Sequence, residues 1–372
     1  MKSLVQPGDG VGPLVAGIDG AQRSVQILIF RFDRREVERA LANAVSRGVN
    51  VHALIAYTNR GGERKLRELE MQLLAAGITV SRTANDMVRY HGKLMIIDRR
   101  DLYLLGFNFT YLDIEHSRSF GVITNNRALV QEAVKLFEAD AARRPYVPGL
   151  PMLVVSPVNA RQSLSRFIQG ARSELLIYDP EISDLAMIRL LEERAEAGIR
   201  IEIIGRMRKQ SLNLAAHKLP RMRLHTRTII RDGRDAFVGS QSLRAAELDE
   251  RREIGVIFRD SKVVNRLIQT FREDWSLQDA FERAGIQELP APPPPPAARV
   301  AKRVVRAVVN GLPPVTPVVE GTVEEVVGFE AAAELDGQEV EDAVKEAVKE
   351  AVKEVVEGLV EEAVQTIPGE NR

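Results

Sequence analysis

The feature that most constrains this chain of 372 residues is a short sequence pattern that occurs twice. In each copy, a histidine is followed by a basic residue two positions later and by an aspartate seven positions later. The residues concerned are His91, Lys93 and Asp98 in the first copy, and His225, Arg227 and Asp232 in the second. The two copies are separated by a constant 134 residues, which indicates that one structural unit has been repeated.

The correspondence between the copies extends well beyond this pattern. It pairs residues 23–30 with 172–178, residues 46–51 with 196–201, and residues 120–123 with 254–257. Within each copy, β-branched runs of strand length alternate with amphipathic segments of helix length. This alternation predicts tandem α/β units in one chain.

The first motif and the residues after it are predicted to form a strand, a tight turn near residues 98–101 and a second strand. Side chains two apart on a strand share a face, so we expect His91 and Lys93 to point the same way and Asp98 to point to the other face. The carboxamide of Asn108 should arrive from the second strand. An imidazole beside an ammonium and an amide is suited to binding and attacking a phosphate group, because it titrates near neutral pH while the other two groups orient the oxygens.

The doubled H-x-K-x4-D pattern, with a trailing glycine and Asn108, resembles the phospholipase D superfamily in the form in which one chain carries both halves. The resemblance covers roughly residues 8 to 280. It implies an α/β fold of two similar α/β/α halves in a pseudo-two-fold arrangement, at residues 1–148 and 149–288, with both motifs at one shared cleft. Residues 289–372 are expected to form a proline-rich linker and an acidic tail that is helical or disordered.

The resemblance also implies phosphodiester cleavage through a covalent phosphohistidine, without a metal or a cofactor. One histidine attacks phosphorus, and the other protonates the leaving oxygen. In the family the N-terminal histidine is usually the nucleophile, which favours His91. We expect Glu253 to hold His225 in its protonated form, which suits a general acid. The predicted catalytic residues are His91, Lys93, His225 and Arg227, and the predicted supporting residues are Asn108, Glu253, Asp98, Asp232, Ser240 and Ser242.

Four positions depart from the family pattern. Arg227 replaces the second lysine, Ser242 replaces the second asparagine, Leu105 replaces a glycine, and Ser119 stands where copy two keeps the acidic Glu253. Each change removes or reshapes a contact that could be made to the transition state. A catalytically degenerate scaffold that binds anionic ligands is therefore an open alternative.

Other kinds of site have little support in the sequence. The chain has no cysteine, no His-Glu-x-x-His sequence and no paired carboxylate cluster, so no metal site is predicted. The glycine-rich stretch 8–12 lacks a following Gly-Lys-Ser/Thr, and residues 239–242 lack the Gly-x-Ser-x-Gly pattern of a serine hydrolase. No signal peptide or membrane span is recognisable, which predicts a cytoplasmic protein, with peripheral membrane contact as an option.

Charge is divided unevenly along the chain. Residues 290–372 hold 8 Lys and Arg against 16 Asp and Glu, whereas the preceding residues hold 44 against 36. The basic excess of the globular part suits an anionic substrate. In the tail, the prolines of 290–296 predict a stiff spacer, the basic segment 299–309 could touch an anionic membrane, and the acidic repeat 343–354 could dock on a protein partner.

The residues alone leave the substrate open. Proteins of the family that this chain resembles act on phospholipid head groups, transfer phosphatidyl groups or cut nucleic acid. Aromatic residues make up only 5% of the chain, which offers little for the base stacking that a nuclease needs. We therefore favour a phospholipid substrate, hydrolysed or transferred, with a metal-independent endonuclease as the alternative.

Overall fold

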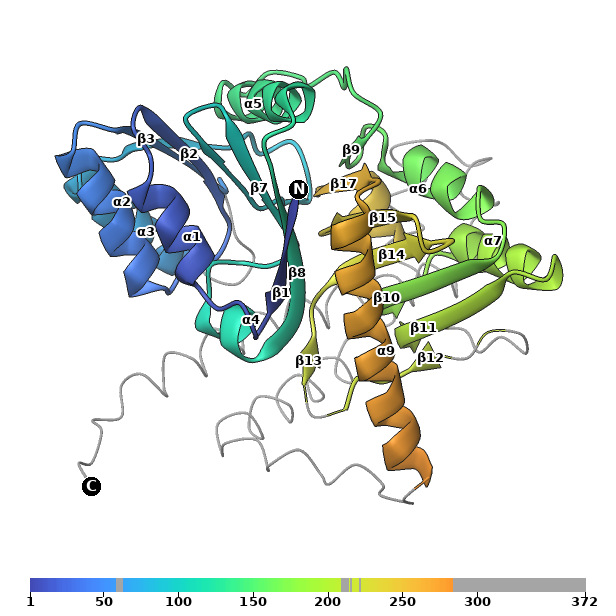
Figure 1. Cartoon of the computed structure of the whole chain (residues 1–372). Coiled ribbons are helices and arrows are strands. Elements are labelled where there is room, and N and C mark those ends of the chain that lie inside the picture. Colours follow the sequence, from blue (N-terminus) through green and yellow to red (C-terminus); the bar gives the residue numbers. More distant parts are fainter. Residues whose placement is uncertain (58–62, 209–213, 215, 221, 284–372) are drawn as a thin grey trace, which may run out of the picture. The chain divides into compact units, whose positions relative to one another are not determined.

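The computed structural model describes residues 1–57, 63–208, 214, 216–220 and 222–283 (Figure 1). Residues 1–58 and 66–288 form one compact unit, which contains both copies of the motif. The expectations for the proline spacer, the basic segment and the acidic repeat after residue 289 lie outside the described residues.

The first half is built around a mixed sheet. Its elements are β1 (Lys2–Gln6), α1 (Gly12–Asp19), β2 (Ser24–Ile29), α2 (Arg35–Ser46), β3 (Asn50–Ile55), α3 (Glu63–Ala75), β4 (Thr79–Arg82), β5 (Arg89–Tyr90), β6 (Leu94–Ile97), β7 (Asp101–Leu105), α4 (Tyr111–Glu115), β8 (Ser117–Thr124) and α5 (Arg127–Ala141). The described strands follow the order β4-β3-β2-β6-β7-β8-β1. Strands β2, β3 and β4 run parallel, and the other neighbours in this order run antiparallel.

The second half repeats this arrangement. Its elements are β9 (Leu153–Val155), α6 (Ala160–Gln169), β10 (Glu174–Ile182), α7 (Leu185–Glu196), β11 (Arg200–Met207), β12 (Ala216–His217), β13 (Arg223–Leu224), β14 (Arg227–Arg231), β15 (Asp235–Gly239), α8 (Ala245–Asp249), β16 (Arg251–Arg252), β17 (Ile254–Phe258) and α9 (Ser261–Arg283). The described strands follow the order β12-β11-β10-β14-β15-β17-β9, which matches the first sheet strand by strand. The predicted α/β fold with two similar halves is confirmed.

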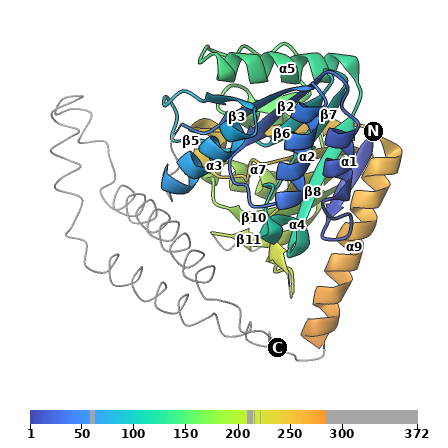
Figure 2. The same cartoon turned by 90° about the vertical axis from the view of Figure 1, so that its left-hand side faces the viewer.

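Buried apolar side chains hold the layers together in three clusters. Helices α1, α2 and α3 cover the outer face of the first sheet, as Figure 2 shows, and α6 and α7 cover that of the second. The inner faces of both sheets pack with α5 and α9 into one shared cluster. In this cluster, Phe120 of the first half meets Tyr178 of the second half edge-on, with 5.3 Å between ring centres. The halves therefore share a hydrophobic core, which fixes one motif against the other.

The motif itself differs from the predicted continuous strand. His91 lies between β5 and β6, and His225 lies between β13 and β14, outside any strand. The residues before each histidine pair with the opposite half, because β5 lies beside β16 and β13 lies beside β8. The His91 N–H donates to the carbonyl of Arg252 at 2.7 Å, and the His225 N–H donates to the carbonyl of Arg118 at 3.0 Å. The prediction of an unbroken strand is wrong here, because the backbone N–H groups of the two histidines donate hydrogen bonds to the opposite half.

Candidate active site

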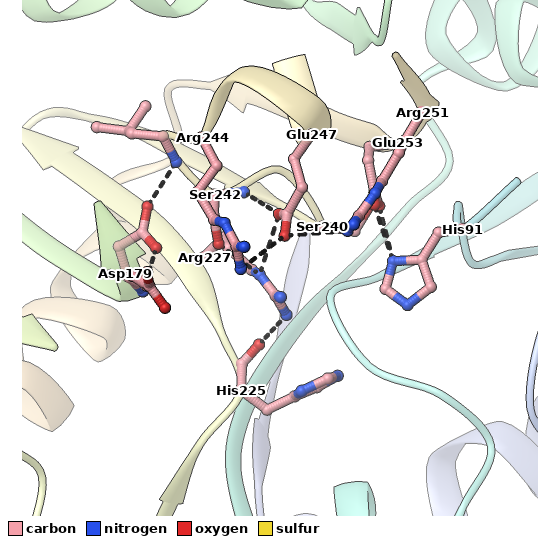
Figure 3. A network of polar contacts seen from close by, with 12 residues as sticks. His91, Asp179, His225, Arg227, Ser240, Ser242, Arg244, Glu247, Arg251 and Glu253 are labelled. Atoms are coloured by element: carbon pink, nitrogen blue, oxygen red, sulfur yellow. Dashed lines mark hydrogen bonds and ion pairs between the residues drawn. The ribbon is translucent and has the colours of Figure 1, made fainter. Parts of the chain in front are cut away.

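His91 is buried at the junction of the two halves and contacts a carboxylate of the second half. Its Nδ1 lies 2.9 and 3.0 Å from the two carboxylate oxygens of Glu253 (Figure 3). The Nζ of Lys93 lies 2.9 Å from both ring nitrogens. The ring of Phe30 meets the imidazole edge-on, with 4.8 Å between ring centres. A carboxylate, an ammonium and an aromatic ring therefore fix the position of His91.

His225 is also buried, and it contacts a carboxylate of the first half. Its Nε2 lies 3.2 Å from Oδ2 of Asp113, which belongs to the short helix α4. The same oxygen accepts hydrogen bonds from the backbone N–H of Asn108 at 2.8 Å and from its side-chain amide at 2.7 Å. The other oxygen of Asp113 accepts a hydrogen bond from Arg223 at 2.5 Å. Asp113 therefore lies between His225 and the segment that follows β7, and Nε2 of His225 makes no hydrogen bond within the described residues.

These contacts correct the predicted pairing of carboxylates with histidines. Glu253 was predicted to support His225, but the structure places it against His91. The residues that lead into Glu253 run beside β5, so its side chain reaches the histidine of the other copy. Asp113 takes the expected place beside His225. Ser119, at the position equivalent to Glu253, is buried, and its Oγ has no hydrogen-bond partner among the described residues.

Lys93 and Arg227 bring positive charge close to the two histidines. Lys93 is fully buried. Arg227 donates from Nη1 to the backbone oxygen of His225 at 2.7 Å and from Nε to Oγ of Ser242 at 3.1 Å. Ser242 therefore holds the guanidinium with a hydroxyl, where the family pattern has an asparagine. Ser240 is buried nearby and accepts a hydrogen bond from the backbone of β17 at 3.1 Å.

Two carboxylates that the sequence patterns did not predict organise the segments after the motifs. Asp113 accepts hydrogen bonds from Asn108, and Glu247 on α8 accepts one from the backbone N–H of Ser242 at 2.6 Å. These two pairs are equivalent, because they are separated by the same 134 residues as the motifs. That offset is the signal that could have found them. The Oδ1 of Asn108 is buried and has no hydrogen-bond partner within the described part of the chain.

Burial changes the pKa values of the groups around His91. Burial and the charge of Lys93 lower the pKa of His91 well below its ordinary value. Burial lowers the pKa of Lys93 to about 7, although Glu253 opposes this shift. Burial raises the pKa of Glu253 to about 7, and here Lys93 opposes the shift. Near neutral pH, His91 is therefore a neutral imidazole between two groups that are both close to titration.

The pKa values of His225 and Asp113 are shifted in a different way from those of the groups around His91. Burial lowers the pKa of His225 to about 4, although Asp113 acts to raise it. Burial acts to raise the pKa of Asp113, but His225 and Arg223 together hold it well below its ordinary value. At neutral pH an ionised Asp113 therefore lies beside a neutral His225. The expectation that Glu253 keeps His225 protonated is wrong, because Glu253 lies elsewhere and burial dominates.

Asp98 and Asp232, the last residues of the two motifs, lie in turns and accept hydrogen bonds from backbone N–H groups. Asp98 accepts hydrogen bonds from the N–H groups of residues 22–24 at 2.7–3.2 Å. Asp232 accepts them from the N–H groups of residues 172–174 at 2.8–3.1 Å. Both aspartates have a positive φ, 54° and 52°, in the tight turn of a hairpin. These contacts stabilise the two turns, and they place both carboxylates on the backbone of their own half.

Asp98→Ala and Asp232→Ala are each expected to lower the free energy of unfolding by about 2–4 kcal/mol, because three backbone N–H groups lose a charged acceptor. Urea unfolding followed by circular dichroism measures the loss. Asp101→Ala is the control, because Asp101 pairs with the exposed Arg100, and such a surface ion pair contributes only about 0–1 kcal/mol. A loss of the same size in all three variants would contradict the assigned role.

Two features are missing from the residues that the structure describes. No group of three or more His, Asp or Glu side chains in those residues is arranged to hold a metal ion. None of the helices within the described ranges combines the length and the low charge of a bilayer-spanning segment.

A family model described as "Cardiolipin synthase, PLD-like domain" matches residues 14–141 and 164–275, which is more than half of the chain. The chain belongs to this phospholipase D-like family. The match falls into two segments, one in each structural half, and each segment contains one motif histidine. The predicted phospholipase D superfamily is confirmed by this match.

Known proteins with a similar sequence or a similar fold match different shares of this chain. A stretch of 123 residues is 30% identical to the mitochondrial cardiolipin hydrolase of Danio rerio and covers 32% of this chain and 53% of that protein. The chain thus spans about half the length of this curated relative. Polyphosphate kinase from Porphyromonas gingivalis has a similar structure, with a TM-score of 0.61 and 19% identity over 73% of this chain and 49% of that chain. For phosphatidylserine synthase from Haemophilus influenzae, the TM-score is 0.58 and the identity 10%, over 74% and 86% of the two chains. At these identities the two structures show a common fold.

Proposed function

We propose that this protein is a phosphodiesterase of the phospholipase D type, which hydrolyses or transfers a phosphatidyl group through a covalent phosphohistidine. The observation that carries the proposal is the crossed pairing of each motif histidine with a carboxylate of the opposite half. Two imidazoles in different electrostatic settings, with two cations close by, are what a two-step displacement at phosphorus requires.

In the first step, His91 acts as the nucleophile. Its Nδ1–H donates to Glu253, which leaves the lone pair of Nε2 for attack on phosphorus. The low pKa of His91 keeps this nitrogen unprotonated at neutral pH. A bond forms between Nε2 and phosphorus as the ester bond to the leaving oxygen breaks. Lys93 and Arg227 stabilise the negative charge that builds up on the phosphoryl oxygens.

His225 supplies the proton for the leaving oxygen. In the free site, burial holds the pKa of His225 at about 4, so its imidazole is neutral at neutral pH. The negative charge of a bound phosphodiester raises that pKa, and His225 takes up a proton from solvent before it donates one to the leaving oxygen. The ionised Asp113 beside Nε2, whose effect is already part of that pKa, then stabilises the imidazolium. In the second step, water or an alcohol attacks the phosphohistidine, His225 takes up the proton of the attacking group, and His91 is released.

The proposed substrate is a phospholipid. Support comes from the description of the family model, which names cardiolipin synthase, and from the fish relative, whose name is cardiolipin hydrolase. The similar fold of a phosphatidylserine synthase adds support for phosphatidyl chemistry. Cleavage of a lipid requires peripheral contact with a membrane surface, and we propose that the protein works there.

An assay of purified, EDTA-treated protein against labelled phosphatidylcholine, phosphatidylglycerol and single-stranded DNA tests the function. We expect metal-independent release of the lipid head group, and intact DNA. The variant His91→Ala/His225→Ala controls for contaminating enzymes. Cleavage of DNA without lipid turnover would replace the proposal by the nuclease alternative, and no turnover of any substrate would favour a degenerate scaffold.

A further inference from the structure

Each motif histidine donates a backbone hydrogen bond to one arginine of the opposite half. Arg252 accepts the bond from the N–H of His91 at 2.7 Å. Arg118 accepts two such bonds, from the N–H groups of His225 and Thr226 at 3.0 and 2.9 Å. The two arginines are equivalent, because they are separated by the same 134 residues as the motifs. The position of each histidine therefore depends on the position of one arginine.

The buried guanidinium of Arg252 forms an ion pair with a helix of the first half. Its Nη2 donates to Oδ1 of Asp140 on α5 at 3.1 Å, and its Nη1 donates to the carbonyl of Ser156 at 3.1 Å. Side chains alternate along an extended strand, so Arg252 points away from the face to which Glu253 directs its carboxylate. The ion pair therefore lies behind the contact between Glu253 and His91.

Arg118 forms the equivalent ion pair with helix α9 of the second half. Its Nε and Nη2 donate to the two carboxylate oxygens of Asp274 at 2.8 and 2.7 Å, and its Nη1 donates to the carbonyl of Gln6 at 3.0 Å. The hydroxyl of Tyr178 donates to the same carboxylate at 2.5 Å. Asp140 and Asp274 are again 134 residues apart. The same crossed ion pair thus occurs once for each histidine.

Each arginine is bound at both ends by the half to which it does not belong. Its carbonyl meets the histidine, and its guanidinium meets the aspartate of the same half. An arginine held in this way leaves little freedom to its own carbonyl. The histidine that donates to this carbonyl is fixed with it.

The burial of both aspartates favours a role in positioning over a role in stability. Only 3% of the surface of Asp140 and 2% of that of Asp274 is exposed. A buried ion pair adds little net stability, because the cost of removing two charges from water offsets their attraction. Its charge-assisted hydrogen bonds are nevertheless short and directional, so they define the geometry of the groups they join.

We propose that Asp140 and Asp274 are positioning residues, each of which acts through its arginine on one motif histidine. Asp140 positions His91, the nucleophile, and Asp274 positions His225, the general acid. This inference rests on the proposed function, because it assigns each ion pair to one of the two histidine roles. A shift of about 1 Å in a reacting group can slow a reaction by about 100-fold, so the two aspartates affect catalysis without contact with the substrate.

The variants Asp274→Asn and Asp140→Asn test the assignment with two phosphodiesters that differ in their leaving group. Asp274→Asn misplaces the general acid, so we expect a loss of about 10- to 100-fold with an alkoxide leaving group and little loss with p-nitrophenolate. Asp140→Asn misplaces the nucleophile, so we expect a loss of about 10- to 100-fold with both substrates. Single-turnover rates at saturating substrate measure the first step alone.

Nuclear magnetic resonance of the histidines tests the positions without any turnover. The chain has five histidines, so protein labelled with ¹³C at histidine Cε1 gives five resonances. We expect Asp140→Asn to shift the resonance of His91 and to leave that of His225 in place. Asp274→Asn should do the reverse. Spectra of His91→Ala and His225→Ala assign the two resonances.

The folding of the variants is checked by thermal unfolding. Burial raises the pKa of Asp140 to about 6, although Arg252 opposes this shift, so the fold tolerates a neutral group at this position. Should a single variant fail to fold, Arg252→Met/Asp140→Asn and Arg118→Met/Asp274→Asn take its place in both experiments. They leave no buried charge without a partner, and asparagine still offers an acceptor to Tyr178.

Asp9→Asn is the matched control, because the ion pair of Asp9 with Arg266 also joins the first half to α9. Arg266 donates to the carbonyl of Ser3, however, and not to a group next to a motif histidine. We expect this variant to keep the single-turnover rates and both resonances of the wild-type protein. If Asp140→Asn and Asp274→Asn show the same leaving-group dependence, or if each shifts both resonances or neither, the ion pairs only join the halves and the inference is refuted. If the wild-type protein cleaves no phosphodiester, the proposed function has failed, and the resonances alone decide whether each aspartate positions one histidine.

Discussion

His225→Ala is expected to slow the cleavage of a phosphodiester with an alkoxide leaving group by about 10²- to 10⁴-fold, the usual contribution of a general acid. The same variant should lose much less activity with a p-nitrophenyl phosphodiester, because p-nitrophenolate leaves without a proton. Initial rates with both substrates at one pH measure the difference. His116→Ala controls for removal of an exposed imidazole from the same protein.

His91→Ala should abolish turnover of both substrates, because no leaving group can replace the nucleophile. In wild-type protein, an acid-labile adduct is expected on His91, in which phosphorus is bonded to the ring nitrogen and keeps its remaining ester group. Mass spectrometry of rapidly quenched, peptide-mapped reactions locates it. His225→Ala should still form this adduct with the p-nitrophenyl substrate, but it should release the adduct slowly, because His225 also activates the incoming water. An adduct on His225 would reverse the two roles.

The general fold could be predicted because the internal repeat is visible in the sequence, both in the order of strand and helix patterns and in the spacing of the two motifs. Alternating strand and helix patterns predict α/β units, and the constant offset between His91 and His225 predicts two equivalent halves. The structure has the same strand order in both sheets. The exchange of short strands between the halves could not be predicted, because β5 and β13 are only two residues long and carry no periodic pattern.

The errors in the site follow from that exchange. Glu253 belongs to the same copy as His225. If the strands were not exchanged, a carboxylate would be expected to support the histidine of its own copy. The exchanged strands carry Glu253 to His91 instead. Asp113 was not predicted because α4 has only five residues, too few for a helical periodicity. The sequence shows which residue types occur and how they are spaced. Contacts between the two copies depend on which strands pair in the folded protein, and the sequence does not show that.

The crossed carboxylates still favour the roles that the family resemblance implies. Glu253 bonds the nitrogen of His91 that must carry a proton if the other nitrogen is to attack. Asp113 remains ionised and lies at a ring nitrogen of His225, where it stabilises a charged imidazolium. The copies differ at Ser119 and Glu253, so only the second copy supplies a carboxylate from this position, and it reaches His91.

Replacement of the two buried glutamates, Glu253→Gln and Glu247→Gln, is expected to change stability in opposite directions at pH 8. Burial raises the pKa of Glu253 to about 7, above its ordinary value, so its ionised form is disfavoured in the fold. This destabilisation develops as the pH rises above the unfolded pKa and is complete above about 7. Burial also acts on Glu247, but Arg227, Arg251 and Arg244 lower its pKa to about 2, so its ionised form stabilises the fold at every pH above the unfolded value.

We therefore expect Glu253→Gln to raise the free energy of unfolding at pH 8, and Glu247→Gln to lower it, each by on the order of 2 kcal/mol. The gain for Glu253→Gln should vanish at pH 4, where the carboxyl is protonated in both states. Urea unfolding at the two pH values measures both effects. The same Glu253→Gln variant should lose about 10- to 100-fold in kcat, because His91 loses a charged partner that orients its ring. A stability gain accompanied by this loss identifies Glu253 as a group kept in an unfavourable state for catalysis, whereas a stability loss at pH 8 would mark it as a structural ion-pair partner of Lys93.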